Sequence, residues 1–94
     1  MSIRFDWDKK KAASNLEMPG VSFEEASTVF DDPLARIFDD EGHSIGEIRE
    51  IIIGHSVTGE LLLVCFTERT SGSIRIISAR PPTKREQYDY EENS

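Results

Sequence analysis

The side chains that could carry chemistry gather in the last third of the chain, between Thr67 and Arg85. From Arg69 onward this stretch holds no acid and has a formal charge of +5, whereas the whole chain has a net charge of −7. Its bases are Arg69, Arg75, Arg80, Lys84 and Arg85. An arginine presents a planar fork of N–H donors that stays charged and suits phosphate oxygens. The pattern is typical of an anion site, and several arginines could stabilise the added charge of a phosphodiester-cleavage transition state.

A second interpretation of the same arginines is structural. Each could pair with a nearby carboxylate or lie on a solvated face, since surface ion pairs are common and weak. The two interpretations differ in geometry. A nuclease site requires several guanidinium groups to converge in one hollow of the sheet, whereas structural pairs would hold each arginine at its own acid.

Proton transfer needs a further group, and His43 is the better of the two histidines for it. It lies in a polar loop with Glu47 nearby in sequence. A loop histidine is also often only solvated. Glu68 could act as a base, or could be the partner of Arg75 across a hairpin. His55 lies in a predicted turn and is expected to have no role.

Metal and cofactor chemistry find no support in the spacing. Acids and one histidine cluster in the second quarter of the chain, at Asp31, Asp32, Asp39, Asp40, Glu41 and His43. They lack the spacing of an EF-hand or of a zinc motif, and the chain has a single cysteine. We also find no glycine-rich phosphate loop and no nucleophile elbow, so no metal or cofactor is predicted.

Two strands are expected to position the arginines. Ser73–Arg80 is rich in isoleucine, and alternation places Ile74, Ile76, Ser78 and Arg80 on one face and Arg75, Ile77 and Ala79 on the other. Leu61–Arg69 is apolar on both faces, which indicates a central strand. The short polar segment between them predicts a hairpin.

The remaining elements complete an α+β domain that spans residues 1–94. Further strands are predicted at Ser2–Asp6, Leu34–Phe38 and Glu47–Ile53, and helices at Lys9–Glu17, at Phe23–Phe30 and from Thr83 to about Tyr90. Capping residues support the helices: Asp8 precedes the first, and S-x-x-E and T-x-x-E boxes open the others. Short links favour a small antiparallel meander, with an N-terminal helical pair and a short C-terminal helix, and helices covering one face.

Composition bounds the setting of this domain. Cys65 lies in an apolar strand, which suits a buried thiol in a reducing compartment. No segment is apolar enough for a membrane span or a signal peptide, so a cytoplasmic protein without membrane contact is expected. The net charge of −7 argues against general adhesion to nucleic acid, leaves room for a local anion site, and suits a basic protein partner.

Several segments together resemble the BrnT family, ribonuclease toxins of bacterial type II toxin–antitoxin systems. The resemblance runs from about Phe5 to Tyr90 and depends on the order of its pieces. These are F-D-W-D at Phe5–Asp8 with Lys11 and Asn15, G-V-S-F-E-E-A at Gly20–Ala26, F-D-D-P at Phe30–Pro33, H-S-x-G-E-x-R at His43–Arg49, T-E-R at Thr67–Arg69, I-R-I-I-S-A-R at Ile74–Arg80, and then Glu86 and Tyr90.

The resemblance implies a fold similar to RelE-type ribonucleases and metal-independent cleavage of RNA. It also implies a partner, a BrnA-type ribbon-helix-helix antitoxin, through which alone the toxin would reach operator DNA. Carried over by position, the implied active-site residues are His43, Arg69, Arg75 and Arg80, with Glu47 and Glu68 as further candidates.

Two departures from the family pattern define an alternative. Met18-Pro19-Gly20 stands where family members usually carry a basic K-H-G, and the tail after Arg80 is less basic than usual. Both changes would weaken RNA affinity. The alternative is therefore an attenuated or non-catalytic acidic module that docks a basic antitoxin.

Overall fold

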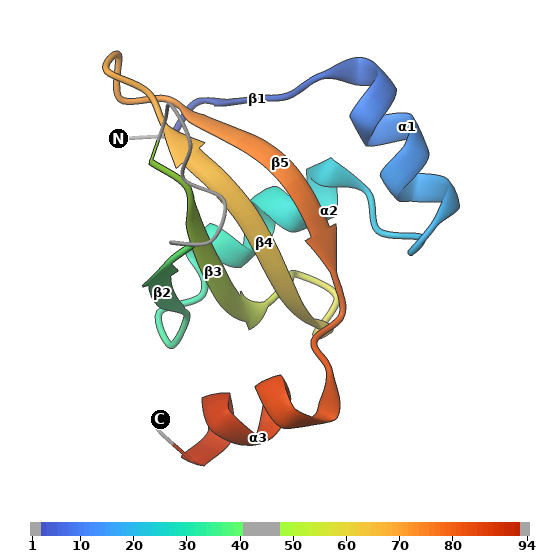
Figure 1. Cartoon of the computed structure of the whole chain (residues 1–94), viewed down its shortest axis with the longest axis vertical. Coiled ribbons are helices and arrows are strands. Elements are labelled where there is room, and N and C mark those ends of the chain that lie inside the picture. The colour runs from blue at the N-terminus through green and yellow to red at the C-terminus, as the bar shows by residue number, and fades with distance from the viewer. Residues whose placement is uncertain (1–2, 41–47, 93–94) are drawn as a thin grey trace.

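One five-stranded sheet forms the centre of the protein (Figure 1). The structure is a computed structural model that describes residues 3–40 and 48–92. Its elements are β1 (Phe5–Asp6), α1 (Lys9–Glu17), α2 (Phe23–Thr28), the 3₁₀ turn η1 (Val29–Asp31), β2 (Arg36–Asp39), β3 (Glu50–His55), β4 (Leu61–Glu68), β5 (Ile74–Arg80) and α3 (Lys84–Glu92). The strand order is β1-β5-β4-β3-β2. The predicted elements are thus all present, with shifted ends.

The strand pairing confirms the predicted meander over four strands and corrects it at the fifth. Strands β2 to β5 are joined in sequence by antiparallel pairing. Strand β1, however, pairs with β5 in parallel, with Phe5 opposite Ile74. The wholly antiparallel sheet was therefore a wrong prediction. A two-residue strand is too short to show a periodicity, and its partner β5 lies far along the chain. The sequence therefore does not reveal the direction of this pairing.

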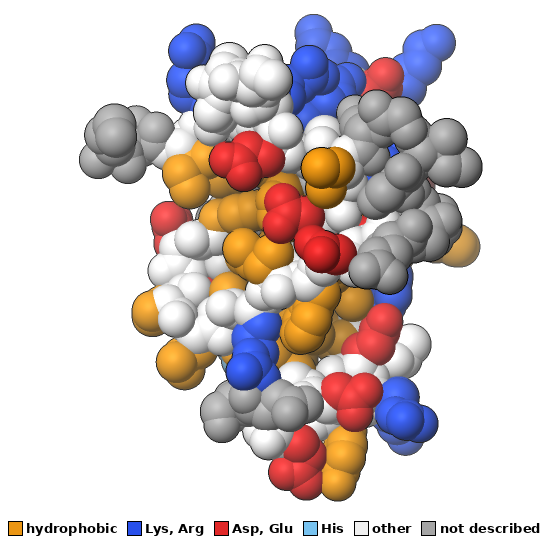
Figure 2. Space-filling view, turned by 60° about the vertical axis from the view of Figure 1, so that its left-hand side comes forward, with side chains coloured by type: hydrophobic (Ala, Val, Ile, Leu, Met, Phe, Trp, Pro, Cys, Tyr) orange, Lys and Arg blue, Asp and Glu red, His pale blue; other side chains and the backbone are white. Residues whose placement is uncertain are grey.

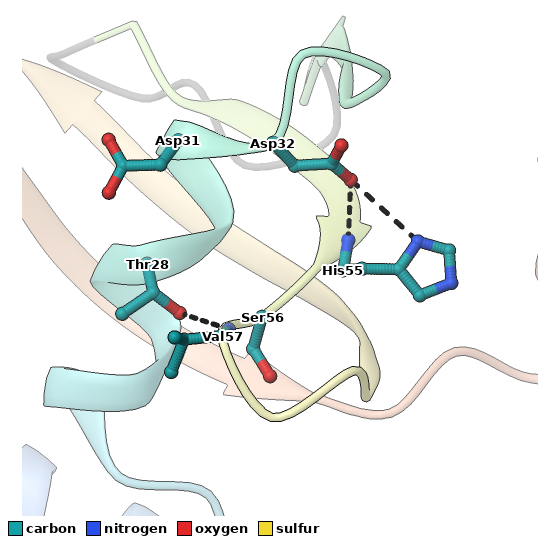
Figure 3. Close-up of a pocket in the computed structure, with 6 residues that line it drawn as sticks. All are labelled: Thr28, Asp31, Asp32, His55, Ser56 and Val57. Atoms are coloured by element: carbon teal, nitrogen blue, oxygen red, sulfur yellow. Dashed lines mark hydrogen bonds and ion pairs between the residues drawn. The ribbon is translucent and has the colours of Figure 1, made fainter.

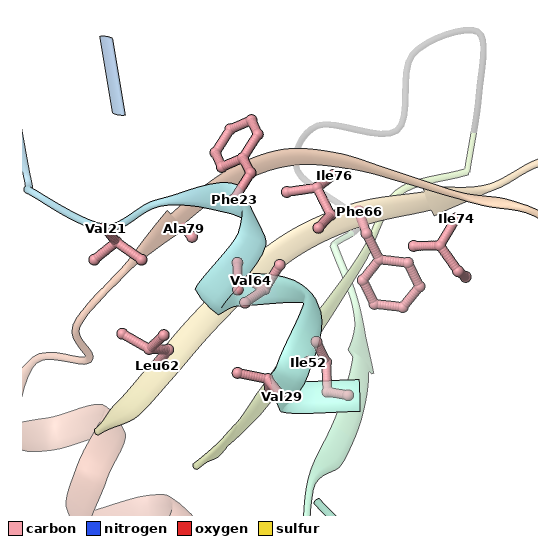
Figure 4. Packing of buried hydrophobic residues seen from close by; sticks show 11 residues of the cluster. Val21, Phe23, Val29, Ile52, Leu62, Val64, Phe66, Ile74, Ile76 and Ala79 are labelled. Carbon is pink, nitrogen blue, oxygen red and sulfur yellow. The ribbon is translucent and has the colours of Figure 1, made fainter. Parts of the chain in front are cut away.

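The hydrophobic core lies between the sheet and α2 (Figure 4). Alternate residues of the central strand β4, Leu62, Val64 and Phe66, point to this side and are at most 3% exposed. Phe23 and Ala26 of α2 pack against them, and both are almost wholly buried. Burying one large apolar side chain contributes about 1.5–3 kcal/mol. The part of this face that α2 covers is therefore filled by core side chains.

A β-bulge in β5 reverses the predicted faces of its last residues. Cys65 lies opposite Ser78 but the next residue, Phe66, lies opposite Ile76, so Ile77 is the extra residue. Ile76 and Ala79, three apart, are consequently both buried in the core. Strict alternation was wrong beyond the bulge. It follows that Arg80 and Arg75 lie on the same side of the sheet, away from α2.

The helices begin where their capping residues predict. The Asp8 carboxylate accepts the backbone N–H groups of Lys10 and Lys11 at 2.8 and 3.1 Å. Ser22 caps α2 by accepting the N–H of Glu25 at 3.0 Å. These bonds satisfy N–H groups that have no partner within a helix. The first helix ends as predicted before Pro19-Gly20, whereas α2 changes to a 3₁₀ turn at Val29.

The third helix contradicts the expectation that all helices cover one face. In α3, Tyr90 is 7% exposed and its hydroxyl donates to the carbonyl oxygen of Leu34 at 3.2 Å. Tyr90 also lines an apolar pocket with Ile53 and Leu63, which point away from the α2 side. The C-terminal helix thus lies beside one end of the opposite face. The middle of that face is left open.

Candidate functional site

The open face of the sheet contains a hollow of about 340 Å³ that we call the Arg80 hollow. It is lined by Asp40, Arg49, Ile51, Leu63, Cys65, Ile77, Ser78 and Arg80. Leu63 faces this side because it alternates along β4 with the core residues Leu62 and Val64. Ser78 faces the same side because it lies opposite Cys65, which also alternates with Val64. Two arginines and one aspartate, Asp40, therefore border a partly apolar depression near the centre of the sheet. This arrangement can bind an anion beside an apolar surface.

Arg80 is held at the edge of the hollow by the first turn of α3. Its two terminal nitrogens donate to the two carboxylate oxygens of Glu86 at 2.8 and 2.9 Å. Glu86 is itself fixed by a capping box, since it accepts the Thr83 N–H at 2.8 Å and donates its own N–H to the Thr83 hydroxyl at 3.1 Å. The hydrogen bonds from Arg80, reinforced by Thr83, lower the pKa of Glu86 to about 2.

The other two predicted arginines lie at a different place. Arg75 donates to the Asp6 carboxylate at 2.9 Å, and the Nε of Arg69 is 3.8 Å from the same carboxylate. Arg75 and Arg80 are five residues apart on one strand, which corresponds to roughly 15 Å. The expected convergence of all three guanidinium groups is therefore wrong. Each of the three contacts a carboxylate, as the structural interpretation predicts.

Glu68 does not contact Arg75. Thr67 lies opposite Arg75, and Glu68 lies opposite Ile74, so the Glu68 side chain projects toward the α2 side of the sheet. It lines a separate shallow hollow beside Arg69 at the end of the β4–β5 hairpin. The proposed pair across the hairpin is thus wrong. The structure separates Glu68 from the Arg80 hollow.

The two remaining predicted residues, His43 and Glu47, lie outside the described residues. The chain on either side of them is described, and the Asp40 N–H donates to the Arg49 carbonyl oxygen at 2.9 Å. Asp40 and Arg49 both line the Arg80 hollow. The roles of His43 and Glu47 stay predictions.

Three residues of the hollow, Asp40, Arg49 and Cys65, were not predicted from the sequence to belong to an anion site. Arg49 is the last residue of the H-S-x-G-E-x-R segment, and no functional role was predicted for it. Cys65 is 9% exposed, as expected for a buried thiol, and its Sγ lies 3.6 Å from an Asp40 carboxylate oxygen. Strand pairing accounts for their common position. Ile51 of β3 lies opposite Cys65, so the chain just before β3, which carries Arg49, approaches the same face of the sheet.

A further pocket lies between η1 and the turn after β3 (Figure 3). It brings Asp32 and His55 together: the Asp32 carboxylate accepts the His55 N–H at 2.8 Å, and His55 Nδ1 is 3.7 Å from the same oxygen. The His55 N–H, followed by that of Leu34, lowers the pKa of Asp32. The Ser56 hydroxyl donates instead to Glu25 at 2.8 Å. The bonds of this pocket join η1 to β3 and serve the fold.

The fold and the Arg80 hollow define a small α+β protein with arginines on an open sheet face. A family model described as ribonuclease toxin, BrnT, of type II toxin-antitoxin system matches residues 7–86. The chain therefore belongs to the BrnT family of ribonuclease toxins, which operate in toxin–antitoxin pairs.

A solved structure supports the fold. The chain is similar to the crystal structure of the Brucella abortus ribonuclease toxin, BrnT, with a TM-score of 0.66 and 20% sequence identity. The similarity covers 88% of this chain and 100% of that one. At this identity it shows the fold alone. The comparison with curated proteins gave no match.

Within residues 3–40 and 48–92, no group of three potential metal ligands comes together. No helix in those ranges is both long and apolar enough to cross a bilayer.

Proposed function

We propose that this chain is a toxin that cleaves RNA without a metal ion, at the Arg80 hollow. The observation that carries the proposal is the pair of arginines, Arg49 and Arg80, that borders this hollow in a chain of the BrnT family. In the proposed reaction the RNA 2′-hydroxyl attacks the adjacent phosphorus and the 5′-oxygen leaves. The products are a 2′,3′-cyclic phosphate and a 5′-hydroxyl end.

The proposed role of Arg80 is to bind the phosphate and stabilise its added charge. Such preorganised donors act most strongly where water is excluded, and the apolar floor of Leu63 and Ile77 favours this. His43, with Glu47 as a second group, is proposed from the sequence to move the protons. Glu68 projects toward the other face of the sheet and has no part in this proposal. Arg69 and Arg75, at Asp6, are proposed to attract RNA to the same side of the protein.

The proposed partner is a BrnA-type ribbon-helix-helix antitoxin, which links the complex to operator DNA in the cytoplasm. Figure 2 shows acidic side chains among apolar ones on the side of the molecule where β2 lies. Ile37 and Phe38 of β2 are 56% and 51% exposed. Such a surface suits a basic, partly apolar partner.

Expression without antitoxin tests the catalytic proposal. Wild type is expected to arrest growth and degrade RNA, and Arg80→Ala to do neither. Arg85→Ala is the matched control, because Arg85 is 85% exposed and lies away from the hollow. Arg80→Lys keeps the charge but loses the fork, so an intermediate effect is expected. Equal growth and intact RNA in wild type and Arg80→Ala would refute the catalytic proposal.

Purified protein tests the metal-independent mechanism. Cleavage is expected to continue in EDTA and to leave 2′,3′-cyclic phosphate ends, which mass spectrometry detects. Cleavage that stops in EDTA and returns with magnesium would contradict this mechanism.

The attenuated module remains the second candidate function, and one observation favours it. The three predicted arginines each contact a carboxylate, at Asp6 or Glu86. In that case the wild type would be harmless in cells and would still bind its antitoxin in a salt-sensitive manner. Binding that salt does not weaken would contradict it.

A further inference from the structure

A second hollow adjoins the Arg80 hollow across β5. Its volume is about 310 Å³. It is lined by Lys10, Lys11, Ser14, Asn15, Met18 and Ile77. Because Ile77 lines both hollows, the two are neighbours that meet at the bulge residue. A chain molecule could therefore pass from one to the other without leaving the surface.

The second hollow exists because β1 is short. It pairs with β5 only at Ile74 and Arg75, and α1 lies beside the rest of that edge. Asn15 anchors the helix there: its amide donates to the Ala79 carbonyl oxygen at 2.8 Å and its oxygen accepts the Ala79 N–H at 3.3 Å. These two bonds replace strand pairing at one residue. The anchor fixes the two lysines of the first helical turn near Ile77.

Both lysines of this hollow are exposed, and neither forms an ion pair with another described residue. The acid closest to them in sequence, Asp8, uses its carboxylate to accept their backbone N–H groups. Those bonds, with a smaller contribution from the Lys11 charge, lower the pKa of Asp8. The ammonium groups of Lys10 and Lys11 are thus available to an external anion.

The distribution of charged side chains also favours an external anion at Lys10 and Lys11. Figures 1 and 2 share their vertical axis, and Lys and Arg side chains gather at the upper end of Figure 2. In Figure 1 that end is formed by β1, α1 and the β4–β5 hairpin. A polyanion would meet a positive surface there although the whole chain is acidic.

We propose that the two hollows form one track for single-stranded RNA. One phosphate lies at Arg80 and a neighbouring phosphate lies between Lys10 and Lys11. The apolar side chains of Ile77 and of Met18, which is 83% exposed, contact a base or ribose between them. A flexible single strand can follow a path that turns over a sheet edge, whereas a duplex cannot. This inference rests on the proposed function and names the path of its substrate.

The test measures the salt dependence of RNA binding by the full chain. The probe is a short, fluorescently labelled single-stranded RNA in which every 2′-hydroxyl is methylated, so that it cannot be cleaved. Each phosphate that the protein neutralises on a single strand contributes about 0.7 to the size of the slope of log K against log salt. The double variant Lys10→Gln/Lys11→Gln removes the contacts to one phosphate and is therefore expected to reduce the slope by about 0.7.

The matched control is Lys9→Gln/Lys84→Gln, which makes the same change in net charge. Lys9 and Lys84 are exposed and line neither hollow. This variant is expected to keep the wild-type slope. An equal reduction in both double variants, or none in either, would overturn the track. So would a wild type that does not bind the probe.

Cleavage of unmodified RNA separates this inference from the proposed function. A wild type that cleaves RNA but shows no slope change in Lys10→Gln/Lys11→Gln refutes the track alone. A wild type that cleaves nothing, while the slope falls only in that variant, refutes the nuclease and supports the track. Thermal unfolding by circular dichroism verifies that the variants are folded.

Discussion

Glu86→Gln should destabilise the protein at neutral pH and much less in acid. The Glu86 carboxylate accepts both terminal nitrogens of Arg80 and the N–H of Thr83. These bonds lower its pKa from 4.5 to about 2. A difference of this size corresponds to about 3 kcal/mol. Since a third of the side chain is exposed, solvent screening reduces this contribution, and we expect about 1.5 kcal/mol.

The sign of the pH dependence follows from the direction of the change. A carboxylate whose pKa is lowered on folding stabilises the protein fully above its unfolded pKa, which is 4.5 for Glu86. That stabilisation is lost as the pH falls from about 4.5 toward 2. Glutamine keeps some hydrogen bonding but carries no charge. The gap in unfolding free energy between wild type and Glu86→Gln should therefore narrow across this interval.

Urea denaturation at pH 7 and at pH 3, followed by Trp7 fluorescence, measures the gap. The control is Glu60→Gln, which makes the same chemical change in an exposed turn with no side-chain hydrogen bond in the described structure. It should follow the wild-type pH dependence. A gap for Glu86→Gln that is equal at both pH values, or absent at pH 7, would refute the assignment of this pair to stability.

Three further substitutions test the packing that positions the hollows, each by urea denaturation against wild type. Asn15→Ala leaves the backbone groups of Ala79 without their partner and should cost about 1–3 kcal/mol; an unchanged midpoint would show that α1 is held otherwise. Gly54→Ala would place a Cβ 2.8 Å from the Ala35 Cβ, so a loss of about 1–3 kcal/mol is expected, and a neutral result would contradict that contact. Phe23→Ala removes a side chain that is 1% exposed and should cost about 3–5 kcal/mol or prevent folding; a loss below this would place Phe23 outside the core.

Local signals explain which elements the sequence predicts correctly. The caps at Asp8, Ser22 and Thr83 each form the hydrogen bond that their spacing implies. These bonds span three residues or fewer, so they need no knowledge of the rest of the chain. The apolar run of β4 likewise predicts its central place, because only a strand covered on both faces tolerates it.

Long-range pairing explains what the sequence does not predict. The bulge at Ile77 changes the face of Arg80, and it depends on the register between two strands. The Asp6 carboxylate meets Arg75 across 69 positions of sequence. The arginine cluster thus indicates an anion site, but its division between Asp6 and Glu86 follows only from the folded chain.

The division of charge has a consequence for how one small acidic chain could serve both RNA and an antitoxin. The principal extents of the molecule are 33, 30 and 26 Å, and the Debye length at 0.1 M salt is about 10 Å. Charges at one end therefore hardly act at the other. On the proposed function, the basic end at α1 and the β4–β5 hairpin would attract RNA in spite of the net charge of −7. The acidic, partly apolar side near β2 would attract the proposed basic partner independently. An antitoxin bound there would not need to compete for the phosphate contacts, so its inhibition would depend on reaching Arg80 rather than on neutralising the lysines.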